Sequence, residues 1–221
     1  MTEQSPPPRC DTAERARVIA AAHALGVPRD YGRRHRLHIM REPRELACIG
    51  IDIHGRKQWL APPAARAWAR MHAAALHDGI ELQVVSAFRS ASYQLRIIQR
   101  KLDHGQSIGE ILRVSAAPGY SEHHCGRVVD ITTPGYAALE EEFEQSPAFA
   151  WLQAQASTFG FRLSYPRNNP HGIAYEPWHW CWRAQPGHPK ARAGRIPRQG
   201  IRQREIPARP ARHPGLAWRQ P

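Results

Sequence analysis

The chain has 221 residues, enough for one catalytic domain of ordinary size with irregular ends. Lys and Arg total 31 against 19 acidic residues, which gives a net charge of +12, and the mean hydropathy is −0.58. This composition excludes a membrane-embedded protein, and no apolar run in the sequence is long enough to form a transmembrane segment.

The two ends differ in composition from the middle of the chain. Residues 1–10 are polar and proline-rich, which predicts disorder, and they lack the apolar core of a signal peptide. We therefore expect a cytoplasmic protein, or one that reaches the cell wall or periplasm by an export or lysis route that the sequence does not reveal. Residues 184–221 contain nine basic residues and one acid, a net charge of +8 (nine minus one), together with many prolines. This predicts a disordered basic tail.

The tail's charge indicates what it could bind. Closely spaced arginines attract anionic polymers without selecting among them. Trp218 is the one aromatic residue there that could stack on a base. We therefore expect non-specific contact with an anionic polymer and no specific nucleic acid partner.

Residues 11–59 are predicted to form an N-terminal subregion with a helix and a hairpin. Asp11 or Thr12 can cap a helix over residues 13–26, which Gly26 ends. Residues 45–62 alternate between apolar and polar side chains around a turn at His54 and Gly55, which indicates a pair of strands.

Residues 60–183 are predicted to form the main domain. Helices are expected over 65–79, 91–105 (capped by Ser90), 107–116 and 148–160, and strands over 81–88, 127–132, 161–166 and 173–183. The acidic run at 139–145 is interpreted as a solvated face. Because helices and strands alternate irregularly and several links are short, we expect an α+β fold with a mainly antiparallel central sheet flanked by helices.

Two short stretches contain the residue types of a hydrolytic zinc centre. Residues 120–131 read YSEHHCGRVVDI, and residues 175–180 read YEPWHW. His123 and Asp130 are seven residues apart, too far for one turn of a helix, and Gly126 lets the chain turn between them. A catalytic zinc needs three protein ligands and one open position, so His179 would be the third ligand. Glu176 would accept a proton from the polarised water.

These motifs resemble the VanY-type D-alanyl-D-alanine carboxypeptidases. The resemblance rests on the SxHxxG pattern with an Asp seven residues after its His, on the downstream EPWH, on VVSAFRSASYQ and on GFRLSYP, and it covers roughly residues 60–183. The family consists of zinc peptidases whose fold group includes lysostaphin-type endopeptidases and the hedgehog N-terminal domain. It therefore implies a fold of the hedgehog and DD-peptidase kind, Zn²⁺ as cofactor, and peptidoglycan or its stem peptides as partner.

The resemblance also implies roles for individual residues. The zinc ligands would be His123, Asp130 and His179. The catalytic base would be Glu176. Arg89 would hold the substrate and stabilise the oxyanion, since a guanidinium donates several hydrogen bonds to a developing negative charge. Ser121 and Trp178 would contact the substrate, although a loop hydroxyl that bonds to backbone and a core tryptophan are simpler interpretations of these two.

Several alternatives remain open at this stage. His124 competes with His123 as a ligand but is one residue out of register with the rest of the motif. Cys125 and Cys181 occupy positions where the family commonly has other residues, and all four cysteines are expected to be free thiols. The leading hypothesis is a D-Ala-D-Ala carboxypeptidase. A phage-lysin-like L-Ala-D-Glu endopeptidase and a zinc-binding cell-wall module without catalysis are the alternatives.

Overall fold

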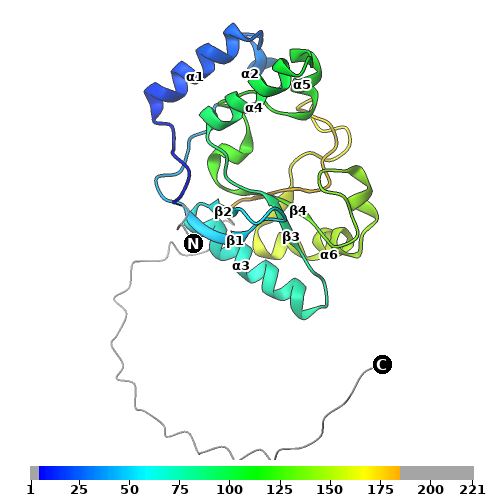
Figure 1. Ribbon diagram of the computed structural model, residues 1–221. Coiled ribbons are helices and arrows are strands. Elements are labelled where there is room, and N and C mark those ends of the chain that lie inside the picture. The colour runs from blue at the N-terminus through cyan, green and yellow to red at the C-terminus, as the bar shows by residue number, and fades with distance from the viewer. Residues whose placement is uncertain (1–4, 185–221) are drawn as a thin grey trace, which may run out of the picture. The chain divides into compact units, whose positions relative to one another are not determined.

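The computed structural model describes residues 5–184 (Figure 1). Residues 1–4 and the predicted basic tail from 185 onward lie outside the described residues, so the predicted disorder there stays a prediction. Among the described residues no helix has both the length and the apolar character that crossing a membrane requires.

A four-stranded antiparallel sheet forms the centre of the molecule. Its order is β3 (Gln83–Ser86), β4 (Val128–Thr132), β6 (His179–Trp182) and β5 (Phe161–Leu163). A separate hairpin consists of β1 (Ala47–Ile51) and β2 (Lys57–Leu60). Together with the helices this confirms the predicted α+β fold with an antiparallel sheet.

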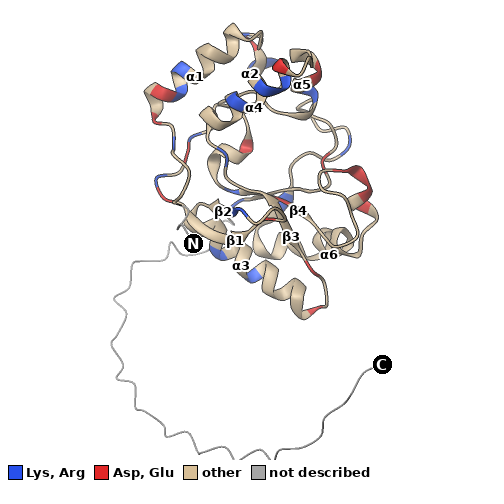
Figure 2. Ribbon diagram, viewed as in Figure 1, with Lys and Arg blue, Asp and Glu red and all other residues tan. Residues whose placement is uncertain are grey.

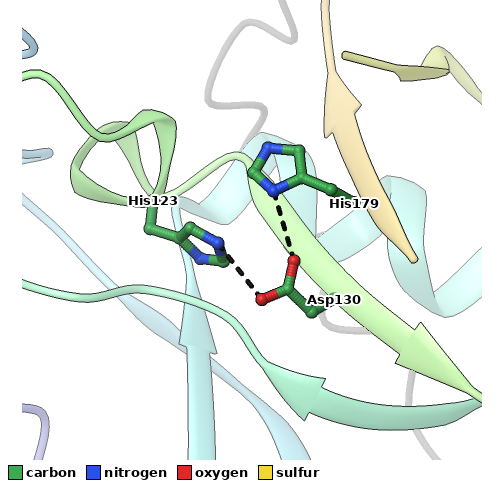
Figure 3. Close-up of side chains that lie close together, drawn as sticks. All are labelled: His123, Asp130 and His179. Carbon is green, nitrogen blue, oxygen red and sulfur yellow. Dashed lines mark ion pairs between the residues drawn. The ribbon is translucent and has the colours of Figure 1, made fainter. Parts of the chain in front are cut away.

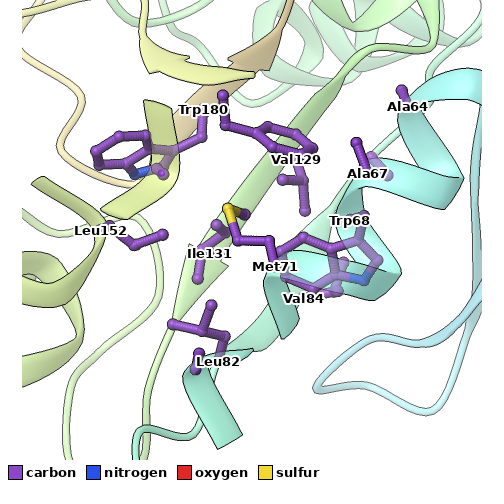
Figure 4. Close-up of a cluster of buried hydrophobic side chains, with 14 of the residues drawn as sticks. Ala64, Ala67, Trp68, Met71, Leu82, Val84, Val129, Ile131, Leu152 and Trp180 are labelled. Atoms are coloured by element: carbon purple, nitrogen blue, oxygen red, sulfur yellow. The ribbon is translucent and has the colours of Figure 1, made fainter. Parts of the chain in front are cut away.

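The main hydrophobic core lies on one face of this sheet. The helices α3 (Pro62–His77) and α6 (Pro147–Gln155) supply Met71 and Leu152, which meet Val129 and Ile131 of β4 (Figure 4). All five residues of β4 are buried. Because side chains alternate along a strand, Asp130 points to the face opposite Val129 and Ile131. The core face of β4 therefore fixes which residue of the strand faces the functional site.

A second group of helices packs away from the sheet. It comprises α1 (Thr12–Ala24), α2 (Tyr31–Arg34), α4 (Ala91–Asp103) and α5 (Ile108–Val114), which lie together at the top of Figure 1. Tyr31, Ile98 and Ile111 form their buried contact. The predicted caps of α1 and α4 are confirmed, because the side chains of Asp11 and Ser90 each accept a backbone hydrogen bond at the helix start. The positions coloured blue on the ribbon of Figure 2 include Arg33 and Arg34 of α2 and Arg96, Arg100 and Lys101 of α4.

Hydrogen bonds connect the N-terminal subregion to the rest of the body. The carboxylate of Glu42 accepts from the backbone N–H groups of Cys10 and Ala91, at 2.7 Å each. The Arg9 guanidinium also donates to the carbonyl of Pro43 at 3.1 Å, so contacts with the body begin before the predicted start of the subregion at residue 11. In the hairpin, the Gln58 amide donates to Asp52 and accepts from the N–H of Ala87. Ala87 follows β3, so the hairpin supports a segment next to the candidate site.

Several predicted elements differ from the structure; the strand predicted over 161–166, for example, is β5 and has three residues. The last strand begins at His179 and not at residue 173, because Pro177 has no N–H for a strand ladder and His179 N–H closes a turn on the carbonyl of Glu176. The helix predicted over 148–160 is α6 followed by a 3-10 turn, η3 (Ala156–Phe159). Two further 3-10 turns, η1 (Glu122–Cys125) and η2 (Glu141–Gln145), lie where a loop and an acidic surface were expected.

Candidate active site

Three elements bring His123, Asp130 and His179 together (Figure 3). Asp130 of β4 and His179 of β6 are direct partners in the antiparallel register, so their side chains share one face of the sheet. His123 comes from η1, which precedes β4. Nε2 of His123 lies 3.2 Å from one Asp130 oxygen, and Nδ1 of His179 lies 3.3 Å from the other. The predicted ligand residues therefore form one buried cluster.

The cluster has the geometry and the unmet bonding capacity of a metal site. His123 Nε2 and Asp130 Oδ1 are buried and make no hydrogen bond within the described chain. One ligand atom from each of the three residues lies within 4.8 Å of the other two, so a single ion can contact all three. Two imidazoles, one carboxylate and an open position are also the donor set of a catalytic zinc. The residues present therefore fit Zn²⁺.

Each histidine bonds through its other ring nitrogen, which fixes the tautomer. His123 Nδ1 donates to the carbonyl of Ala87 at 2.6 Å, so Nε2 keeps its lone pair for a metal. His179 Nε2 faces the Glu122 carboxylate at 3.2 Å, which leaves Nδ1 on the metal side. Sequence reasoning missed Glu122. It adjoins a predicted ligand in the EHH run, but nothing local indicates that its side chain reaches a histidine 57 residues away.

The carboxylates around His179 give this cluster an excess of negative charge. Burial opposes ionisation of Asp130, but His123 and His179 outweigh it and hold the pKa of Asp130 well below its ordinary value. Burial also disfavours the charged form of His179, yet its bonds to Asp130, Glu122 and Glu176 raise the pKa of His179 well above its usual value. Three carboxylates thus surround one imidazole. A divalent metal ion is a natural counter-charge for such a group.

Glu176 lies beside the ligands without belonging to them. Its Oε2 is 3.2 Å from His179 Nδ1, the nitrogen that faces Asp130. The turn that ends in β6 holds it there, because its backbone N–H bonds to the carbonyl of Tyr165 and its carbonyl accepts from the N–H of His179. Pro177 within this turn keeps the segment out of the sheet. A carboxylate at this position can exchange a proton with a molecule at the metal.

Arg89 follows β3 and is held to η1 through its backbone. The second histidine of the motif, His124, is fully buried, and its Nδ1 donates to the carbonyl of Arg89 at 2.6 Å. Its Nε2 accepts from the N–H of Gly119 at 3.1 Å. Burial lowers the pKa of His124 to about 3, so the ring is neutral and both nitrogens are occupied. His124 is therefore a structural residue in contact with the Arg89 segment, and not a ligand.

The Arg89 side chain is half-buried and borders a pocket. Its Nε is buried and makes no hydrogen bond within the described residues. The pocket has a volume of about 200 Å³ and is also lined by Ser86, Tyr93 and Arg96. Ser86 pairs with Asp130 in the sheet, which locates the pocket next to the cluster. Neither this pocket nor the larger hollows of about 710 Å³ elsewhere are lined by His123, Asp130 or His179, so the donor set and not a hollow identifies the site.

The two weaker substrate candidates have structural roles in the described chain. Ser121 is buried as the N-cap residue of η1, and its carbonyl accepts the N–H of His124. Trp178 packs against the main core, and its carbonyl accepts the N–H of Ile131. Neither belongs to the His123, Asp130 and His179 cluster. Their contact with substrate stays a prediction.

The two unusual cysteines lie together behind the ligands. Cys125 ends η1 and Cys181 is in β6, and each stands two residues after a ligand histidine. The thiol of Cys125 donates to the Glu122 carbonyl at 2.8 Å. A hydrogen bond between the two thiols lowers the pKa of Cys125 and raises the pKa of Cys181. All four cysteines are free, as predicted, and this pair is packing behind the site.

The antiparallel sheet with two histidines, an aspartate and a nearby glutamate defines a peptidase-like metal centre. The family model described as VanY, D-alanyl-D-alanine carboxypeptidase, matches residues 57–185, more than half of the sequence. The chain belongs to the VanY D-alanyl-D-alanine carboxypeptidase family. The resemblance inferred from the motifs is therefore confirmed.

Individual relatives agree with this assignment. YodJ of Bacillus subtilis (strain 168) is 33% identical over 146 residues, which are 62% of this chain and 53% of YodJ. The bifunctional D-Ala-D-Ala dipeptidase and D-Ala-D-Ala carboxypeptidase VanXYC of Enterococcus gallinarum is 29% identical over 156 residues, 66% of this chain and 77% of VanXYC. The chain thus spans only about half the length of YodJ.

The solved structure of the LdcB LD-carboxypeptidase has a similar fold. It superposes with a TM-score of 0.57 and 30% sequence identity, covering 64% of this chain and 69% of LdcB.

Proposed function

We propose that this protein is a zinc-dependent peptidase that removes the terminal D-alanine from peptidoglycan stem peptides ending in D-Ala-D-Ala. The single observation that carries the proposal is the convergence of His123, Asp130 and His179, with Glu176 Oε2 3.2 Å from His179 Nδ1. Three ligands and one unused carboxylate are the minimum set for metal-assisted hydrolysis. Membership of the VanY family supports the substrate class.

The residues of the chain divide the chemistry among them. Zinc, when bound, supplies a Lewis acid that polarises a water molecule and the carbonyl of the scissile bond. Glu176 accepts the proton of the attacking water and delivers it to the leaving amine, because it is the carboxylate that faces the ligands without a place among them. Asp130 and the two histidines would hold the ion, and the Ala87 carbonyl accepts from Nδ1 of His123.

Arg89 is proposed to bind the negative charge of the substrate. A carboxypeptidase must recognise a terminal carboxylate, and a guanidinium pairs with a carboxylate through two parallel hydrogen bonds. The unbonded Nε of Arg89 and the adjoining pocket of about 200 Å³ support this role. Arg96 lines the same pocket and adds a second positive charge.

Product analysis on defined muropeptides tests the proposal. Purified protein with zinc should release free D-alanine from pentapeptide stems, and a chelator should stop the release. Because LdcB is an LD-carboxypeptidase, a second substrate class is included in the assay. Tetrapeptide stems, in which D-alanine is joined through an L,D bond, should then also release free D-alanine. Cleavage between L-Ala and D-Glu, with no free D-alanine, would instead support the endopeptidase alternative. Zinc binding with no cleavage of any stem peptide would support a non-catalytic module.

The sequence of the tail supports a separate binding proposal. Its charge of +8, from nine basic residues and one acid in residues 184–221, would attract an anionic cell-wall polymer non-specifically. A protein truncated after Arg183 should lose salt-sensitive binding to such a polymer and still hydrolyse short peptides. If the truncated protein bound the polymer as the full chain does, the tail would have no part in binding.

A further inference from the structure

Behind His179, on the side away from the other ligands, lies a buried acid that the proposed chemistry does not use. Glu122 is the first residue of η1 and is 9% exposed. Its Oε2 lies 3.2 Å from Nε2 of His179, and its Oε1 lies 3.2 Å from a guanidinium nitrogen of Arg183. Burying a carboxylate is costly unless it is paired. These two contacts, together with a hydrogen bond from the side chain of Ser164, are the pairings that allow it to be buried here.

The position of Glu122 excludes it from the ligand set. It contacts Nε2 of His179, whereas Asp130 and Glu176 contact Nδ1 of the same ring. The imidazole therefore stands between Glu122 and the space where the ligand atoms of His123, Asp130 and His179 converge. Glu122 can act on a metal only through His179.

The contact gives Nε2 of His179 a partner when Nδ1 binds a metal. A neutral imidazole has one N–H and one lone pair, and an ionised carboxylate can only accept. Nδ1, which faces Asp130, must keep its lone pair to bind a metal, so the hydrogen is then on Nε2, where the Glu122 carboxylate at 3.2 Å can accept it. The charged acceptor also makes the imidazole a stronger ligand than a backbone carbonyl would. Arg183 holds the second oxygen of Glu122 and so keeps the carboxylate facing the ring.

We propose that Glu122 is a positioning residue that fixes the tautomer and orientation of His179 for the metal, with Arg183 as its support. This inference rests on the proposed metal centre. It accounts for an asymmetry between the two histidines: His123 is held by the Ala87 carbonyl, whereas His179, which faces two further carboxylates through Nδ1, is held by a charged group. Loss of Glu122 would free the His179 ring to rotate or to present its other nitrogen.

Zinc affinity, measured by competition with a chromogenic chelator, is the primary test. Glu122→Ala should bind zinc about 10- to 100-fold more weakly than the wild type. Glu122→Gln should lose less, because its amide oxygen can still accept the Nε2 hydrogen. Glu142→Gln removes an exposed acid of η2 and should bind as the wild type does, which controls for overall charge. Wild-type affinity in both Glu122 variants would overturn the inference.

A spectroscopic readout separates positioning from a purely structural role. The visible absorption of the cobalt(II)-substituted protein reports ligand geometry, so its band should shift in Glu122→Ala and keep its wild-type form in Glu142→Gln. If Glu122→Ala fails to fold, the zinc affinity of the near-isosteric Glu122→Gln is the test. A zinc affinity equal to that of the wild type would then contradict the positioning role of Glu122. A wild-type protein that binds no zinc would refute the metal centre itself. Zinc binding without release of D-alanine would refute the proposed reaction and leave the Glu122 test valid.

Discussion

Gly126 is the position at which the geometry of the candidate site can be tested most sharply by one substitution. It ends η1 in the left-handed conformation, with φ +63°, and its carbonyl accepts the N–H of Ala61 at 2.7 Å. A Cβ added here would lie 3.0 Å from Cγ of Pro43 and 3.1 Å from the backbone nitrogen of Ala61. The residue also connects His123 to the strand that contains Asp130. Gly126→Ala should therefore disturb both stability and metal binding.

The two sources of strain can be added as an order-of-magnitude figure. A left-handed conformation costs a residue with a Cβ about 1–2 kcal/mol. Crowding in a well-packed region costs about 1–3 kcal/mol more, and here one neighbour is backbone that cannot rotate away. The sum of about 2–5 kcal/mol corresponds to a fall in Tm of roughly 4–20 °C for a domain of this size. A shift of His123 relative to Asp130 should weaken zinc binding as well.

Gly55 supplies the matched control for this experiment. It also has a positive φ, +74°, but nothing lies within 4 Å of an added Cβ. Gly55→Ala should therefore show the conformational cost alone, a fall in Tm of about 2–8 °C, with unchanged zinc affinity. Both variants would be measured by thermal unfolding of the metal-free protein and by chelator competition. If Gly126→Ala were no less stable than Gly55→Ala and bound zinc normally, the close contact with Ala61 would not constrain the site.

Three further changes separate chemistry from architecture. Glu176→Gln should lower kcat about 100- to 10,000-fold in steady-state assays, because an amide cannot accept the proton, while one zinc ion per chain is retained. His124→Ala should reduce the free energy of unfolding, measured in denaturant, by about 2–4 kcal/mol, because the change opens a cavity and removes the hydrogen-bond donor of the Arg89 carbonyl. The control His54→Ala, at an exposed histidine, should change the free energy of unfolding by no more than about 0.5 kcal/mol. Burial disfavours the charged form of Asp52, but the hydrogen bonds it accepts outweigh burial and lower its pKa. The ionised form of Asp52 therefore adds stability that is fully present above the unfolded pKa of about 3.9 and is lost as the pH falls through the lower folded pKa. Asp52→Asn has no such carboxylate, so its Tm should differ less between about pH 6 and pH 3 than the Tm of the wild type. Equal Tm differences in wild type and variant would contradict this assignment.

The features that sequence predicted correctly are those that depend on local spacing. The apolar positions of α3 and α4 recur with helical periodicity, and Ser90 caps α4 through a bond to a residue three positions away. The three candidate ligands lie together in the structure, and the motifs place His123 and Asp130 on either side of Gly126. Antiparallel pairing then brings His179 opposite Asp130. Local patterns therefore indicated the elements and the candidate ligands.

The features that sequence missed depend on contacts between distant segments. Residues 173–178 are rich in apolar and aromatic side chains and so resemble a strand, but the N–H of Glu176 bonds to the carbonyl of Tyr165 and the chain turns. Glu122 could not be assigned because its partner, His179, is 57 residues away. The same holds for His124, whose burial and bond to Arg89 are invisible in a run of two histidines. These residues belong to no periodic pattern of apolar and polar residues, so the sequence does not indicate where their side chains point.

The four residues of η1 explain why these missed residues matter. Successive side chains of a short 3-10 turn point in different directions, so Glu122 reaches behind a ligand, His123 faces the metal position, and His124 reaches the segment after β3. The two adjacent histidines donate to the carbonyls of Ala87 and Arg89, each at 2.6 Å. A displacement of Arg89 therefore strains the same turn that supplies a ligand. The proposed metal position and Arg89 are thus both connected to η1, which would preorganise the distance between the two charges that the proposed reaction requires.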